Sequence, residues 1–200
     1  TGLGMGLILN GVLWRGRHGG AGELCNLPLS RARRALVHRY ASGRNAAGAT
    51  IEDLVSGKGL TKAYASLQQD STAAAPADMD HRLVPAVFSN SAQGDFAASQ
   101  AIEAMALECA YAIEQLEHIL DPQLYVLGGG VGARPEVLEA VNRALAHRGI
   151  RVQASVFQAQ AASGSSLRAL GAGLAGALLQ AWEQHKSLHA VAQQSPATAH

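Results

Sequence analysis

Two glycine-rich turns are the first features of this 200-residue sequence with the potential for chemistry. The first turn covers residues 1–6, where Gly2, Gly4 and Gly6 alternate with other residues before a pair of short apolar runs. It differs from a dinucleotide fingerprint, because the third glycine position holds Leu7 and the segment leads into a hairpin instead of a helix. Its backbone N–H groups and the Thr1 hydroxyl could still bind phosphate oxygens. Taken alone, the turn fits either a phosphate site or an ordinary hairpin entry.

The second turn is the run Gly128, Gly129 and Gly130, which directly follows the apolar segment 124–127. Three consecutive glycines are conformationally costly and are tolerated where another backbone or a flat ligand must come close. A strand-to-helix turn is the alternative, but it requires one glycine rather than three. The run therefore favours the approach of a ligand.

Two carboxylates lie beside flexible backbone and are candidates for binding hydroxyl groups. Glu23 follows a glycine-rich loop, and Glu52 precedes a Ser-Gly-Lys-Gly sequence at 56–59. Together with Asn26, they could share hydrogen bonds with sugar hydroxyls. Spacing alone favours the alternative that both are ordinary surface glutamates.

Several other functions are excluded or disfavoured by composition. The net charge of +1 argues against an electrostatic nucleic-acid binder. The eight histidines show no metal-ligand spacing, and no order of residues typical of acyl transfer is present. Two cysteines, no secretory signal and an apolar run at 170–179 that is too short for a membrane span predict a cytoplasmic protein.

The order of predicted elements indicates an α/β protein. Strands are expected near 5–9 and 12–15, joined by Asn10 and Gly11 in a type I′ turn. A long amphipathic helix is expected over 95–120, its apolar stripe running from Phe96 to Leu120 and including Cys109 as a core residue. The remaining predicted segments are helices at 31–41, at 51–67 with a break at 56–59, at 135–149 and at 167–182, strands at 124–127 and 150–157, and a loop at 70–80. In such folds ligands bind beyond the carboxyl ends of strands, where the second glycine run lies.

Four segments in order resemble motifs of the ROK family of sugar kinases and repressors, specifically of its C-terminal lobe. The segment 1–11 looks like the family's phosphate-binding hairpin, and 22–29 resembles its Gly-Glu-x-Gly-His-x-Pro-x sequence. The segment 51–60 is similar to Leu-Glu-x-x-x-Ser-Gly-x-Gly-Leu, and 120–131 to Leu-Asp-Pro-x-x-x-x-Leu-Gly-Gly-Gly-Val. These segments read TGLGMGLILNG, GELCNLPL, IEDLVSGKGL and LDPQLYVLGGGV.

The resemblance implies an actin-like, ribonuclease-H-like fold, with a mixed sheet and flanking helices in this lobe and with ATP, Mg²⁺ and a hexose such as glucose between two lobes. Glu23 and Glu52 would bind sugar hydroxyls, and Asn26 occupies the position of a sugar-contacting, zinc-binding histidine. The nucleotide would contact Thr1, Gly2 and Gly4 with its phosphates and Gly128, Gly129 and Gly130 with its adenosine.

The sequence departs from the family pattern at the zinc-ligand positions and in the absence of the N-terminal motifs, and each departure leads to a prediction. The three cysteine ligands of the family's zinc site are replaced by Gly43, Asn45 and Thr50, and its histidine by Asn26, so no structural zinc is expected. The family's N-terminal phosphate loop and general base have no counterpart in these residues, and the base is expected upstream of Thr1. Residues 1–185 are therefore expected to form one lobe of a longer protein, followed by a disordered tail at 186–200.

The leading hypothesis is a glucokinase-like enzyme, of which this lobe alone is inactive. A sugar-sensing repressor with an upstream DNA-binding part, and a catalytically silent sugar-binding homologue, remain the alternatives. The helices that begin at 95 and 167 have apolar faces, and members of the family that the sequence resembles often form dimers. Both points favour a homodimer. Neither membrane association nor direct nucleic-acid binding is expected of this segment.

Overall fold

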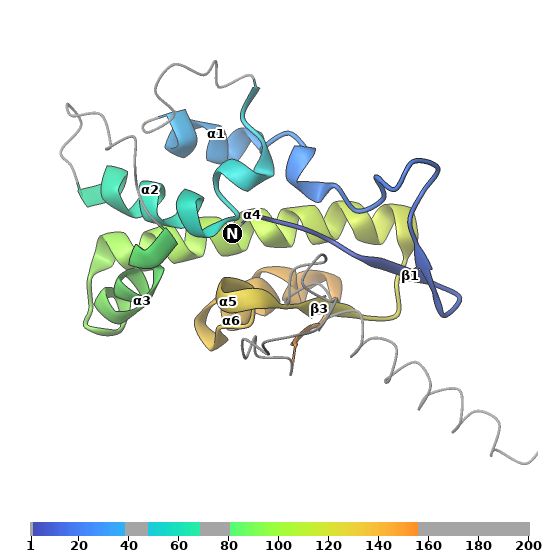
Figure 1. Cartoon of the computed structure of the whole chain (residues 1–200). Helices are drawn as coiled ribbons and strands as arrows, with labels where there is room; N and C mark the ends of the chain where they lie inside the picture. Colours follow the sequence, from blue (N-terminus) through green and yellow to red (C-terminus); the bar gives the residue numbers. More distant parts are fainter. Residues whose placement is uncertain (1, 39–47, 69–80, 156–200) are drawn as a thin grey trace, which may run out of the picture.

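The computed structural model describes residues 2–38, 48–68 and 81–155. A long helix, α4 (Phe96–Leu120), runs through the middle of the molecule. Figure 1 shows α1 and α2 on one side of α4, and β3, α5 and α6 on the other. Thr1, the predicted loop 70–80, the predicted helix 167–182 and the tail 186–200 lie outside the described residues.

The N-terminal hairpin forms as the sequence predicts, with shorter strands. β1 (Leu7–Leu9) pairs antiparallel with β2 (Val12–Trp14), in a register that places Leu9 opposite Val12. Asn10 and Gly11 have φ angles of 52° and 77°. These are the positive values that a type I′ turn requires at both central positions.

In the part of the chain that the structure describes up to Gln68, short 3-10 helices and two α-helices follow the hairpin. They are η1 (Leu24–Asn26), α1 (Arg31–His38), η3 (Ile51–Asp53) and α2 (Gly57–Gln68). The two predicted helical pieces are present as η3 and α2, but the break between them lies at 54–56 and not at 56–59, because α2 already begins at Gly57. The Ser56 Oγ accepts a hydrogen bond from the Gly59 N–H at 3.0 Å, as an N-terminal cap does.

The helix α3 (Val84–Ala92), preceded by η4 (His81–Leu83), was not expected from the sequence. The long helix α4 begins and ends as predicted. Asp95 caps it by accepting from the Ala98 N–H at 3.0 Å, and Asp121 ends it with a left-handed φ of 42°. The Tyr64 hydroxyl donates to the Asp95 carboxylate at 2.6 Å and so ties α2 to the start of α4.

The predicted apolar stripe of α4 is correct in its middle and wrong at its start. Ile102, Met105 and Ile113 are buried, whereas Phe96 is 74% exposed. Six residues separate Phe96 from Ile102, which turns Phe96 about 120° away from the buried face at 100° per residue. Cys109 packs against the core as expected, and burial beside Glu108 raises the pKa of its thiol to about 12.

The second half contains the parallel strands that the sequence predicts. β3 (Tyr125–Leu127) pairs parallel with β4 (Val152–Ala154), placing Leu127 beside Ala154. Between them lie α5 (Gly129–Gly132), α6 (Pro135–Leu145) and η5 (Ala146–Arg148). Pro135 opens α6, and Gly149 follows η5 with a φ of 71°, both as predicted.

The core lies where α4 packs against α2, α3 and α6, and Figure 1 shows α2 and α6 on opposite sides of α4. Its fully buried members include Leu60, Phe88, Met105 and Leu145. The described strands form one antiparallel and one parallel pair, so both pairings of a mixed sheet are present, in two separate pieces. Within the described part of the chain, no helix combines the length and the apolar character needed to cross a bilayer.

Candidate sugar and nucleotide site

Glu23 is brought against the first glycine turn by the glycine that precedes it. Gly22 has a φ of 87°, and a Cβ at this position would overlap the Met5 carbonyl oxygen. Only glycine allows this approach together with this backbone conformation. Glu23 then leads into η1 with its side chain exposed to solvent. The carboxylate is therefore held beside the turn and remains open to a ligand.

Glu52 is positioned by a short antiparallel connection between two loops. Pro28 and Thr50 form an isolated bridge, and the Ile51 N–H donates to the Leu27 carbonyl at 2.8 Å. The Thr50 N–H donates to the Asp53 carboxylate at 2.9 Å and fixes the start of η3. The segments that carry Glu23 and Glu52 are thereby locked side by side.

Helix α2 supports η3 from behind through one glycine. A Cβ on Gly59 would come within 2.6 Å of the Asp53 carbonyl oxygen and 2.7 Å of the Leu54 carbonyl oxygen. The absence of a side chain lets the first turn of α2 pack directly on η3. Glu52 therefore lies on a short element that is backed by a buried helix.

Contacts between side chain and backbone join these segments to the first turn. The Leu3 N–H donates to Glu52 Oε1 at 3.1 Å, and a Cβ on Gly2 would overlap the same oxygen. The structure thus brings Gly2 and Glu52, predicted separately for nucleotide and sugar, into direct contact. Gly4 lies in the same turn with open space around it, within the described residues, and Thr1 lies outside those residues.

Cys25 is an unpredicted member of this site. Its thiol donates to Glu23 Oε2 at 3.4 Å. Burial, this hydrogen bond and the negative charges of Glu23 and Glu52 together raise the pKa of the thiol above its ordinary value. A cysteine where the family motif has glycine was the available signal. Asn26, in the same short helix, is exposed and its N–H donates to the Glu23 carbonyl at 3.1 Å.

Glu108 is a second residue that the sequence reasoning missed. Its side chain is 1% exposed on α4 and accepts from both the N–H and the hydroxyl of Ser30, at 2.7 and 2.5 Å. Ser30 immediately precedes α1 and follows the segment that carries Glu23. A charged residue at helical spacing from Met105 and Ala112 was the signal that could have revealed it. Glu108 fixes the loop behind the site.

The second glycine run forms the end of β3 and the start of α5. Gly128 precedes α5, Gly129 has a φ of 80°, and a Cβ on Gly129 or Gly130 would meet none of the described atoms within 4 Å. The backbone conformation thus favours glycine at Gly129, and the surface beside Gly129 and Gly130 is open. Among the described residues, no hydrogen bond or ion pair joins this run to Glu23 or Glu52, so the two predicted half-sites are not in direct polar contact.

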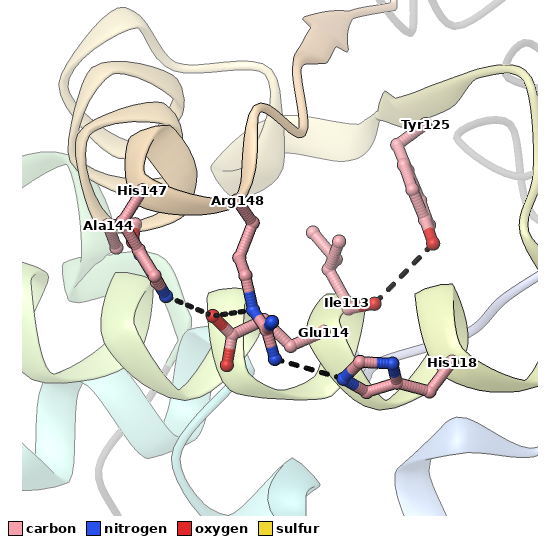
Figure 2. Close-up of polar contacts among 7 residues, drawn as sticks. All are labelled: Ile113, Glu114, His118, Tyr125, Ala144, His147 and Arg148. Carbon is pink, nitrogen blue, oxygen red and sulfur yellow. Dashed lines mark hydrogen bonds and ion pairs between the residues drawn. The ribbon is translucent and has the colours of Figure 1, made fainter.

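Polar contacts from α4 hold β3, which directly precedes this run, and η5, which follows α6. Figure 2 shows Glu114 paired with His147 at 3.1 Å and with Arg148 at 3.8 Å, and Arg148 joined to His118 at 3.0 Å. Tyr125 of β3 donates to the Ile113 carbonyl and to Glu117, at 3.4 and 2.9 Å. Burial and the Glu117 contact raise the pKa of Tyr125. The arrangement anchors β3 to the long helix.

Metal binding finds no support in the described residues. Within 2–38, 48–68 and 81–155, no group of three or more His, Cys, Asp or Glu side chains is arranged to hold an ion. Of the positions that replace zinc ligands, Gly43 and Asn45 lie outside the described residues. Thr50 is occupied in the capping of η3.

Comparison with known proteins identifies the family to which the chain belongs. The family model described as "ROK family" matches residues 1–181. The N-acetyl-D-glucosamine kinase of Pasteurella multocida is 31% identical over 158 residues, which cover 76% of this chain and 48% of that protein. The chain thus spans about half the length of the curated relatives it matches.

Solved structures agree on the fold. The ROK hexokinase of Thermus thermophilus matches with a TM-score of 0.61 and 26% identity, over 93% of this chain and 56% of that one. A ROK family glucokinase of Streptomyces griseus, solved with glucose and AMPPNP, matches with a TM-score of 0.58 and 20% identity, over 90% of this chain and 57% of that one. The α/β arrangement around α4 is therefore that of the actin-like sugar kinases, and the chain belongs to the ROK family.

Proposed function

We propose that the protein carrying this chain phosphorylates a hexose with ATP, and that this segment supplies part of both binding sites. The observation that supports it most directly is the contact of Glu52 with the glycine turn, with Glu23 held against the same turn by Gly22. A phosphoryl donor and a hydroxyl acceptor must lie next to each other for in-line transfer. Relatives that are N-acetylglucosamine kinases and glucokinases support the same reaction class.

The side chains of the site suit the recognition of a sugar. Glu23 and Glu52 carry acceptor oxygens for hydroxyl groups, and hydrogen bonds to ionised carboxylates are among the stronger ones. Asn26 is exposed beside Glu23 and can donate as well as accept. Two carboxylates at one end of the site would orient the ring so that a single hydroxyl faces the donor phosphate.

The backbone of the site suits the binding of phosphate. The turn is open at Gly4, and the Leu3 N–H already holds an anionic oxygen, that of Glu52. We assign the phosphates of ATP to this turn, including Thr1, and the adenosine to Gly128, Gly129 and Gly130. Mg²⁺ would neutralise charge on the phosphates. A general base would come from elsewhere in the full-length protein.

The test is ATP-dependent phosphorylation of a panel of hexoses, including glucose and N-acetylglucosamine, by the full-length protein. We expect glucokinase-like activity, and for Glu23→Ala a fall in kcat/KM of about 10- to 100-fold, from the loss of charged hydrogen bonds. Glu139→Ala, which removes an exposed carboxylate of α6, is the control and should have no effect. Unchanged activity in Glu23→Ala would refute the site, and no turnover of any hexose would refute the function.

A catalytically silent sugar-binding homologue is the second candidate, favoured by Asn26 in the place of the family's histidine. Calorimetric titration with glucose, N-acetylglucosamine and AMPPNP separates the two candidates. Binding of both a sugar and the nucleotide, with turnover, supports the kinase. Binding of sugar without turnover supports the silent homologue. The isolated 200 residues are expected to show weak or no turnover, because the general base is expected upstream of Thr1.

We further propose a cytoplasmic homodimer. The chain's free thiols Cys25 and Cys109 fit a reducing compartment. Ile119 on α4 is 75% exposed and, with Phe96, offers apolar surface to a second copy. Sedimentation of the full-length protein tests the dimer, and an Ile119→Glu variant should shift it toward the monomer.

A further inference from the structure

The hydrogen bond between Leu3 and Glu52 has a consequence for the order in which ligands bind. The Leu3 N–H belongs to the turn to which we assign the phosphates, and it donates to Glu52 Oε1 at 3.1 Å. A carboxylate oxygen and a phosphate oxygen are both anionic acceptors, so they compete for one N–H group. Without ligands, Glu52 therefore occupies a position that a phosphate would need.

Gly2 shows how closely the carboxylate covers the turn. A Cβ on Gly2 would overlap Glu52 Oε1. Any side chain at this position would therefore collide with the carboxylate. At Gly4, two residues on, a Cβ would meet none of the described atoms within 4 Å.

The charge of Glu52 adds to the competition. A phosphate that approaches the turn meets a carboxylate a few ångströms away, and like charges at such distances repel measurably even when partly solvated. Glu23 contributes charge from the same side, since both carboxylates act on the Cys25 thiol. Sugar hydroxyls, in contrast, offer donors to Glu52 and carry no charge.

We propose that Glu52 couples the sugar and nucleotide sites by blocking the first turn until a sugar binds. Hydroxyl groups of the sugar donate hydrogen bonds to the Glu52 carboxylate in place of the Leu3 N–H, which then becomes available to a phosphate. Sugar binding then strengthens nucleotide binding, and by linkage the nucleotide strengthens sugar binding by the same factor. This inference rests on the proposed function of the site.

The experiment measures the Kd of magnesium AMPPNP for the full-length protein by calorimetry, without sugar and with saturating glucose or N-acetylglucosamine, whichever the activity assay selects. We expect the sugar to lower this Kd by about 5- to 100-fold, the usual range for coupled sites. An identical Kd with and without a sugar that the protein phosphorylates would overturn the coupling and leave the proposed function intact. Absence of any sugar phosphorylation would overturn both.

Two variants test whether Glu52 is responsible. Glu52→Gln removes the charge, and Gly2→Ala displaces the carboxylate while keeping both Glu52 and the Leu3 N–H. In each variant the sugar-free Kd for AMPPNP should approach the value measured with sugar. Glu139→Ala, which removes an exposed carboxylate of α6 outside the proposed site, is the control, and the ratio of the two Kd values should persist. Full coupling in both Glu52→Gln and Gly2→Ala would overturn the assignment.

Discussion

Cys25 has a chemical environment that makes its reactivity a direct report on Glu23. The thiol donates to Glu23 Oε2, and burial followed by the two carboxylates keeps its pKa above the usual 9.0. Alkylating reagents react with the thiolate, so a raised pKa slows the reaction at neutral pH. The partly exposed thiol is therefore accessible but protonated.

Alkylation of Cys25 by iodoacetamide, followed by mass spectrometry across a pH series, should show a rate that rises through a midpoint above pH 9.0. Glu23→Gln removes one of the charges that favour the protonated thiol, so it should lower the midpoint and speed alkylation at pH 7.5. A saturating sugar should protect Cys25. Cys109, with a pKa of about 12, is the internal control and should stay unmodified. A midpoint unchanged by Glu23→Gln would contradict the assigned contact.

At the residue scale, the sequence could indicate Glu23 and Glu52 as candidate site residues because both lie in local motifs. It could not predict that Glu52 holds the Leu3 N–H, 49 residues away, or that Cys25 points at Glu23. Such contacts depend on how loops fold back on one another, which local spacing does not encode.

At the scale of single elements, the connection between the first turn and η1 depends on Gly22. The chain offers a matched pair for testing this, because Gly19 also has a positive φ, of 77°, but has no described atom within 4 Å of a built Cβ. Gly19→Ala should cost about 1–2 kcal/mol of stability, the price of a left-handed alanine. Gly22→Ala should cost more and raise the KM for sugar by about tenfold or more, because the overlap with Met5 moves Glu23. Equal effects of the two variants on KM would contradict the positioning role of Gly22.

The connection between η1 and α1 depends in turn on the buried carboxylate of α4. Glu108→Ala leaves the Ser30 N–H and hydroxyl without their acceptor, and should destabilise the protein by about 2–4 kcal/mol in urea unfolding. Glu103→Ala on the same helix breaks only an exposed pair with Arg143, at 2.6 Å, and should cost less than about 1 kcal/mol. Comparable losses in the two variants would argue against the Ser30 contacts as the source of stability.

Element prediction was best where local chemistry decides the structure. Asn10 and Gly11 specify their turn, Asp95 its cap, and Pro135 and Gly149 the limits of one helical segment. It correctly divided 51–67 into two helical pieces but placed the break at 56–59 and not at 54–56, because Ser56 caps α2 and Gly59 packs against η3. The predicted burial of Phe96 was wrong, because tertiary packing selected a different face of α4 for the core.

At the scale of the whole molecule, α4 is the central helix against which the elements of the proposed site pack. It carries α2 and η3 on one side and the parallel strands with their glycine run on the other (Figure 1). Ordered motifs allowed the sequence to indicate the family, and the match over residues 1–181 confirms it. The mutual placement of the two glycine turns was not predictable, because residues 1–6 and 128–130 lie far apart in the sequence and local patterns do not specify how distant segments pack.

The most direct test of the proposed site is a crystal structure of the full-length protein with the hexose that it phosphorylates and AMPPNP. We predict sugar hydroxyls within hydrogen-bond distance of both Glu23 and Glu52, and phosphate oxygens on the turn that contains Gly2 and Leu3. A sugar bound away from both carboxylates would contradict the account.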